Sequence, residues 1–184
     1  MIYELPKSLE VCGIKYEIRS DYRAVLDICT ALSDRELSET EKILVVLEIF
    51  YPDFENMPYE HYEEAVRQCF WFIDCGEDTS AKPQNQPKVM DWDQDFAYIV
   101  APVNRVLGKE IREVDYLHWW SFVSAYNEIG DCTFAQIVSI RNKKARGKKL
   151  EKEEQDWYRQ NRHLVDFAQK FTDTDKEIMK AWGV

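Results

Sequence analysis

The strongest candidate for a catalytic or metal-binding site in this sequence is a short acidic run, Asp91-Trp92-Asp93-Gln94-Asp95. On a helix, Asp91 and Asp95 lie on one face, where two carboxylates could hold a hard cation such as Mg²⁺. Together with Asp93 and His118, these two acids would suit a metal-dependent hydrolase. However, Asp at the beginning of a helix also caps backbone N–H groups and favours the positive end of the helix dipole. Because the sequence specifies no third oxygen ligand, we favour capping and predict no metal site.

Other catalytic arrangements find no support in the residue pattern. The three histidines, His61, His118 and His163, lie far apart without metal-ligand spacing. An odd number of cysteines with no Cys-x-x-Cys pair indicates free thiols in a reducing compartment; they are Cys12, Cys29, Cys69, Cys75 and Cys132. The glycines occur singly, so there is no glycine-rich phosphate loop. We therefore expect no catalytic residue, no cofactor and no enzymatic activity.

The most unusual segment is aromatic and reads Leu117-His118-Trp119-Trp120-Ser121-Phe122. A helix over about residues 114–129 would be apolar almost all round, which is typical of a central core helix whose indole N–H groups are satisfied internally. Alternatively, part of this aromatic face binds a partner. We favour the core for most of these side chains. The candidate partner-binding residues are Trp119, Trp120, Phe122, Tyr126, Arg141 and Lys144.

Charge is unevenly distributed along the chain. The formal net charge is −10, and residues 34–78 hold thirteen acidic against three basic residues. Residues 141–149 hold six basic residues and no acid. The net charge disfavours nucleic-acid binding, and the basic run lacks the aromatic residues of a base-stacking platform. A solvated basic helix end is the favoured interpretation. Contact with an acidic protein surface, including that of another copy in a homo-oligomer, is the alternative.

Local patterns predict a mainly α fold, a helical bundle of about six to seven helices with a short N-terminal β-hairpin. Residues 9–18 alternate apolar and polar types around Gly13, which predicts the hairpin turn. Ser38 and Thr133 each begin a capping-box pattern, and Pro102 is expected to kink or interrupt its helix. Apolar stripes predict helices over residues 21–33, 38–50, 62–75, 91–107, 114–129, 133–147 and from 151, with a final turn at 175–182.

The polar, proline-containing stretch 76–90 is the one linker-like segment. It predicts an N-terminal part, residues 1–75, with the hairpin and three helices, and a C-terminal helical part, residues 91–184; one continuous domain is the alternative. No apolar run approaches the roughly 20 residues that cross a bilayer, and the N-terminus lacks the pattern of a secretion signal. We therefore expect a cytoplasmic protein without a membrane partner.

Several short motifs of the C-terminal half resemble a small protein family of long-tailed phages and prophages of Gram-positive bacteria. These motifs are Asp91-Trp-Asp-Gln-Asp95 with Ile99, Gly108-Lys-Glu-Ile-Arg112, Leu117-His-Trp-Trp-Ser-Phe122, Ile137-Val-Ser-Ile-Arg141, Gly147-Lys-Lys-Leu150 and Trp157-Tyr158. The likeness covers most of the chain and is densest over residues 91–158. Members of the family look like tail-assembly chaperones.

The resemblance implies a function in holding another protein, and no catalytic residue. A chaperone of this type would bind the long, helical tape-measure protein in the host bacterial cytoplasm, as an oligomer in one version, and recruit the tail-tube protein. Helix-in-groove contacts suit that role. The alternative is a structural tail or connector subunit of the phage particle, whose N-terminal hairpin extends the sheet of a neighbour.

Overall fold

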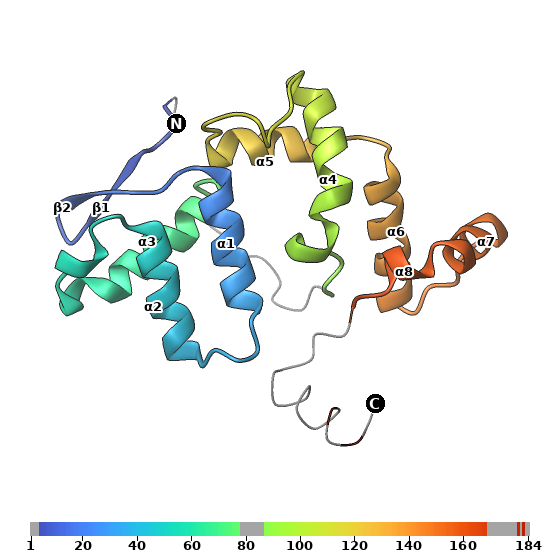
Figure 1. The fold of residues 1–184 in the computed structure, drawn as a ribbon, viewed down its shortest axis with the longest axis horizontal. Coiled ribbons are helices and arrows are strands. Elements are labelled where there is room, and N and C mark those ends of the chain that lie inside the picture. Colours follow the sequence, from blue (N-terminus) through green and yellow to red (C-terminus); the bar gives the residue numbers. More distant parts are fainter. Residues whose placement is uncertain (1–3, 78–86, 169–179, 181, 183–184) are drawn as a thin grey trace.

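A computed structural model describes residues 4–77, 87–168, 180 and 182 of the chain (Figure 1). This described part contains eight α-helices, two short 3₁₀ helices and one two-stranded sheet. The prediction of a mainly helical fold with an N-terminal hairpin is confirmed. There are eight helices rather than six or seven because the region after residue 151 divides into two. Most of the predicted turn at 175–182 and of the predicted loop at 76–90 lies outside the described residues.

The hairpin consists of β1 (Ser8–Val11) and β2 (Ile14–Glu17), which pair antiparallel. Cys12 and Gly13 connect the strands with φ angles of 51° and 78°. A two-residue turn with positive φ at both positions matches the right-handed twist of the strands, and Gly adopts it without strain. A two-stranded sheet is marginal alone, and β1 packs against α3 (Tyr62–Ile73).

The N-terminal helix α1 (Tyr22–Ser33) packs on α2 (Glu39–Phe50), and α2 packs in turn on α3. The capping box predicted at Ser38 is present, because the Ser38 hydroxyl accepts from the Glu41 N–H while the Glu41 carboxylate accepts from the Ser38 N–H. Two 3₁₀ helices, η1 (Phe54–Asn56) and η2 (Tyr59–His61), connect α2 to α3.

The remaining helices continue along the molecule from its middle to the side away from the hairpin (Figure 1). They are α4 (Trp92–Leu107), α5 (Trp119–Asn127), α6 (Thr133–Ala145), α7 (Lys152–Gln160) and α8 (Arg162–Val165). Helices α4 and α5 pack on α1, and α4 also packs on α6. Within the described residues, none of these helices combines the length and apolar character needed to span a membrane.

Two local expectations for these helices are wrong, and one alternative of a third is excluded. Helix α5 begins at Trp119 rather than near residue 114, because its preceding residues pair in extended form with the chain before α1: the Tyr22 N–H donates to the Leu117 carbonyl at 2.9 Å. Helix α6 is capped by the Cys132 sulfur, which accepts from the Ala135 N–H, and not by a Thr133 capping box. Helix α4 is continuous through Pro102, so the expected interruption does not occur, whereas a kink at this residue stays a prediction.

One hydrophobic core joins the two sides of the 76–90 segment. It extends from Leu9 in the hairpin to Phe134 in α6. Across the predicted boundary, the rings of Tyr22 and Phe122 stack with centroids 4.9 Å apart. Ile137 and Ile140, further along α6, and Val165 of α8 are also buried, but they are not part of this cluster. The core is thus continuous from the hairpin to the first turn of α6.

Candidate functional site

The aromatic segment that begins α5 lies in the core. Trp119 is 3% exposed and Phe122 is fully buried, and both rings contact Trp92 of α4, with centroids 5.9 and 6.0 Å from it. Trp120 and Tyr126 are half-buried, and the Tyr126 ring also packs on Trp92 at 5.3 Å. Trp119 and Phe122 are therefore not available to a partner at the surface of the folded chain, and the core interpretation holds for them.

Both indole N–H groups of this segment are satisfied by the end of α3. Trp119 Nε1 donates to the Ile73 carbonyl at 2.9 Å, and Trp120 Nε1 donates to the Phe72 carbonyl at 2.8 Å. The last carbonyls of a helix have no intrahelical donor. The two tryptophans thus cap α3 and hold it against α5, which is a structural role.

His118 is the N-cap of α5 and has no free ring nitrogen. Its Nδ1 accepts from the Trp120 N–H at 3.0 Å, and its Nε2 lies 2.9 Å from the Pro6 carbonyl. An acceptor at Nδ1 requires the proton at Nε2, so the ring is neutral and donates to Pro6. Burial lowers the pKa of His118, with a further lowering by Lys7, although the bond to Pro6 opposes this. The imidazole is therefore fixed as a cap rather than available as a base.

The acidic run at the beginning of α4 binds an arginine of its own chain. Asp91 caps α4 by accepting from the Gln94 N–H, as predicted. Asp95 is fully buried and forms a salt bridge at 2.6 Å with Arg141, itself 4% exposed. Arg141 was a candidate partner-binding residue at a solvated helix end, and its burial corrects that placement. Among the described residues there is no group of three or more side chains that could hold a metal ion.

Lys144 is exposed on α6 but is also engaged within the chain. Its Nζ lies 2.6 Å from the Asp166 carboxylate and 4.0 Å from the centroid of the Tyr158 ring. Burial opposes ionisation of Asp166, yet its bonds to Lys144, Arg162 and Tyr158 lower its pKa to about 2. Lys144 therefore fixes the segment after α8 on α6, and a partner would have to compete with these contacts.

Four of the five cysteines have a raised thiol pKa. Burial raises the pKa of Cys29 and of Cys75 to about 11 and raises that of Cys69 further. Cys12 donates to the Glu64 carboxylate, which raises its pKa. A nucleophilic cysteine needs a lowered pKa, and in these four residues the shift has the opposite direction.

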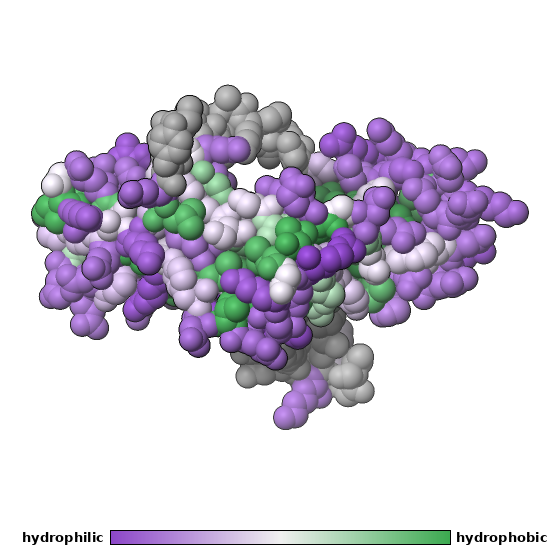
Figure 2. Space-filling view, turned by 90° about the horizontal axis from the view of Figure 1, so that it is seen from above, coloured by the Kyte–Doolittle hydropathy of each residue, from purple (hydrophilic) through white to green (hydrophobic). Residues whose placement is uncertain are grey.

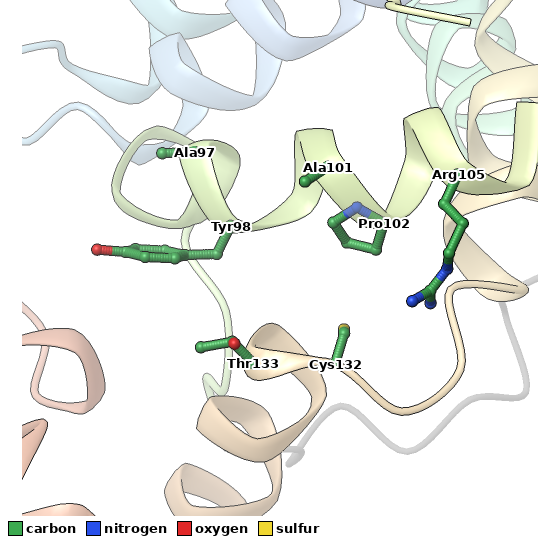
Figure 3. A pocket seen from close by; sticks show the side chains of 7 residues that line it. All are labelled: Ala97, Tyr98, Ala101, Pro102, Arg105, Cys132 and Thr133. Carbon is green, nitrogen blue, oxygen red and sulfur yellow. The ribbon is translucent and has the colours of Figure 1, made fainter. Parts of the chain in front are cut away.

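A groove of about 410 Å³ lies between α4 and the beginning of α6 (Figure 3). The side chains of Ala97, Ala101 and Pro102 form its α4 wall, and the opposite wall comes from the first residues of α6. The Tyr98 ring lies at one end and the Arg105 guanidinium at the other (Figure 3). The complete lining is Ala97, Tyr98, Ala101, Pro102, Arg105, Cys132 and Thr133.

The groove has the size and lining to receive an apolar side chain of a partner, next to which the partner could carry a polar side chain. Ala97 and Ala101 are exposed and one turn apart, so a second helix could approach α4 closely at this point. Pro102 has no N–H, so the Tyr98 carbonyl lacks its helical donor. Arg105 supplies a cation at the other end, where it donates to the Ile129 carbonyl. Sequence analysis missed this site, although Pro102 within a helical pattern was a signal for it.

Apolar side chains also gather on the face seen in Figure 2, in the middle of the molecule. Helices α4 and α5 are uppermost there in Figure 1. Val106 in the last turn of α4 is 41% exposed and Tyr116 before α5 is 44% exposed. Both ends of the molecule are mainly hydrophilic in this view (Figure 2). On this face the apolar surface is therefore central, and hydrophilic residues predominate toward the two ends.

The fold and these sites define a helical protein whose acidic, imidazole and indole groups described above serve its own structure, with an open groove at its surface. The family model described as "Bacteriophage Gp15 protein" matches residues 1–167, and the chain belongs to this family. It is thus a phage structural or morphogenesis protein. No curated protein and no solved structure matches the chain.

Proposed function

We propose that this protein is a non-enzymatic tail-assembly chaperone, which binds the tape-measure protein in the host cytoplasm while the phage tail is built. The observation that carries the proposal is the open α4–α6 groove in a member of a phage family. The engagement of Asp95, His118 and the tryptophans inside the chain supports binding rather than catalysis.

The groove suits one side chain from an amphipathic helix. An apolar anchor would occupy the space beside Ala97 and Ala101, while an acidic neighbour of that anchor would meet Arg105. A single contact of this size is weak. A tape-measure protein presents many helical turns, and repeated weak contacts along one long chain gain avidity while each stays displaceable by the tail tube. That combination is what a transient chaperone requires.

Co-expression tests this function. The protein is produced together with the tape-measure protein of the same phage, and the soluble fraction is measured with and without it. The expected result is that the tape-measure protein becomes soluble and co-purifies with the chaperone. A tape-measure protein that stays insoluble, or is soluble without binding, would contradict the proposal.

A structural tail or connector subunit is the second candidate, and the hairpin favours it. The described residues add no third strand to β1 and β2, and Ile14 at the turn is 49% exposed. An unpaired strand edge can extend the sheet of a neighbour. Mass spectrometry of purified particles separates the two candidates: a subunit is present in stoichiometric amount, whereas a chaperone occurs in the infected lysate and is missing from the particle.

A further inference from the structure

An exposed aromatic side chain lies among acidic residues in the connection between α2 and α3 and in the first turn of α3. Tyr59 is 80% exposed, and residues 53–64 contain five acids and no Lys or Arg. Glu55, Glu60 and Glu63 are exposed and form no ion pair with any described residue. We call these four residues the acidic tip. An aromatic face with adjacent carboxylates is the chemistry that recognises a Lys or Arg side chain.

The acidic tip is held in place by the core beneath it. The Tyr59 ring packs on Tyr62, and the Tyr62 ring packs on Phe54, both with centroids 5.2 Å apart. His61 Nδ1 lies 2.9 Å from the Tyr16 hydroxyl, which ties η2 to the hairpin. A surface held in this way loses little conformational freedom when a partner binds.

A matching set of cations lies just after α6. Arg146, Lys148 and Lys149 are exposed, and none of the three forms an ion pair with a described residue. We call them the basic turn. Gly147, with φ 63°, ends the helix, and the Lys148 N–H donates to the Lys143 carbonyl at 2.8 Å. This hydrogen-bonded helix end holds the cations close together.

The acidic tip and the basic turn are far apart in one molecule. In Figure 1 the α2–α3 connection lies at the end with the hairpin, whereas the end of α6 lies on the opposite side, near α7. A chain therefore cannot join its own two surfaces, but two copies can. We propose that the basic turn of one copy binds the acidic tip of the next, so that copies associate head to tail.

Head-to-tail contacts have a distinctive consequence. Since each contact uses two different surfaces, every copy added leaves one of each unoccupied, and association continues as an open chain or closes as a ring. Exposed ion pairs are individually weak and are screened by salt. The association is therefore expected to rise with protein concentration and to be lost at high salt. It goes beyond the proposed function, because it needs no tape-measure protein.

Sedimentation velocity of the whole protein at low and high salt tests this inference. One variant removes the charges of the basic turn, Arg146→Gln/Lys148→Gln/Lys149→Gln. The other alters the acidic tip, Glu55→Gln/Tyr59→Ser/Glu60→Gln/Glu63→Gln. All of these positions are exposed, so folding is retained, which circular dichroism checks. A charge-matched control is Lys7→Gln/Arg35→Gln/Lys109→Gln, also at exposed sites.

The expected results differ for each sample. The unchanged protein and the control sediment faster as concentration rises at low salt, and each variant alone remains a monomer. A mixture of the two variants forms a dimer and nothing larger, because only one intact tip and one intact turn can meet. A wild-type protein that remains monomeric at low salt would overturn the inference. So would variants that associate like the wild type, or a mixture that remains monomeric.

Discussion

Arg141 binds Asp95 through both terminal nitrogens of its guanidinium, which lie 2.6 Å from one carboxylate oxygen and 3.0 Å from the other. Their side chains are 3% and 0% exposed. Arg141 also donates hydrogen bonds to the backbone carbonyls of Val165, Leu164 and Val89. One arginine of α6 therefore connects α4, the chain before it and the end of α8. The same contact leaves the Asp95 oxygens unsuited to a metal ion.

Removing one member of this pair should destabilise the fold strongly. Asp95→Asn leaves a buried guanidinium charge unpaired, and we expect it to lower the free energy of unfolding by about 3–5 kcal/mol. Arg141→Met should cost a similar amount, while the double variant should cost at least about 1 kcal/mol less than the sum, because the two residues interact directly. Urea denaturation measures all three, with Asp156→Asn of the Asp156–Arg159 pair, whose side chains are 49% and 71% exposed, as a nearly silent control. Additive losses would contradict this account of the pair.

The indole N–H groups should matter for stability independently of the aromatic rings. Trp119→Phe keeps most of the ring packing but removes the donor to the Ile73 carbonyl, so we expect a loss of about 1–3 kcal/mol. Trp182 is 80% exposed, and Trp182→Phe is the matched control, with little expected change. Thermal unfolding followed by circular dichroism compares them. Equal melting temperatures for the two variants would show that the α3 cap is unimportant.

Stability should fall as the pH drops below the ordinary pKa of histidine. Burial lowers the pKa of His118 from 6.5 in the folded state, so the unfolded chain takes up a proton before the folded chain does. The contribution of neutral His118 to the free energy of unfolding is complete at neutral pH and declines from about pH 6.5 downward. This decline lies above the range near pH 4 in which carboxylates begin to protonate. The measurement is the free energy of unfolding at about pH 7 and about pH 5. His118→Asn, which can still cap α5, should flatten this decline, whereas His163→Asn at an exposed site should not.

Structural features that depend only on residues close together in the sequence could be predicted. The Cys12–Gly13 turn follows from local alternation, and the Ser38 capping box follows from a spacing of three residues. The beginning of α5 could not be predicted in this way. The Leu117 N–H donates to the Asp21 carboxylate, which is 96 residues away in the chain, and this pairing replaces the first expected turns of the helix.

For the candidate site residues too, the composition of a segment could be read from the sequence, but the burial of each side chain depends on distant contacts. Arg141 and Lys144 belong to one basic run, yet one is buried and the other is exposed, because Asp95 lies beneath only the first. The apolar composition of residues 114–129 correctly indicated a core helix, but the exposure of Trp120 and Tyr126 depends on how α3 and α4 pack. The groove requires α4 and α6 to lie side by side, and only the folded chain shows that arrangement.

We propose that the groove between α4 and α6 receives a side chain of the tape-measure protein. Ala101→Trp fills the groove from an exposed position, so it should leave the fold intact. Ala145→Trp adds the same bulk at an exposed position of α6 outside the groove and is the control. The direct measurement is the affinity of each purified variant for a helical fragment of the tape-measure protein, by isothermal titration calorimetry. We expect at least about tenfold weaker binding for Ala101→Trp, a change of roughly 1.4 kcal/mol, and unchanged binding for Ala145→Trp. Undiminished binding by folded Ala101→Trp would contradict it.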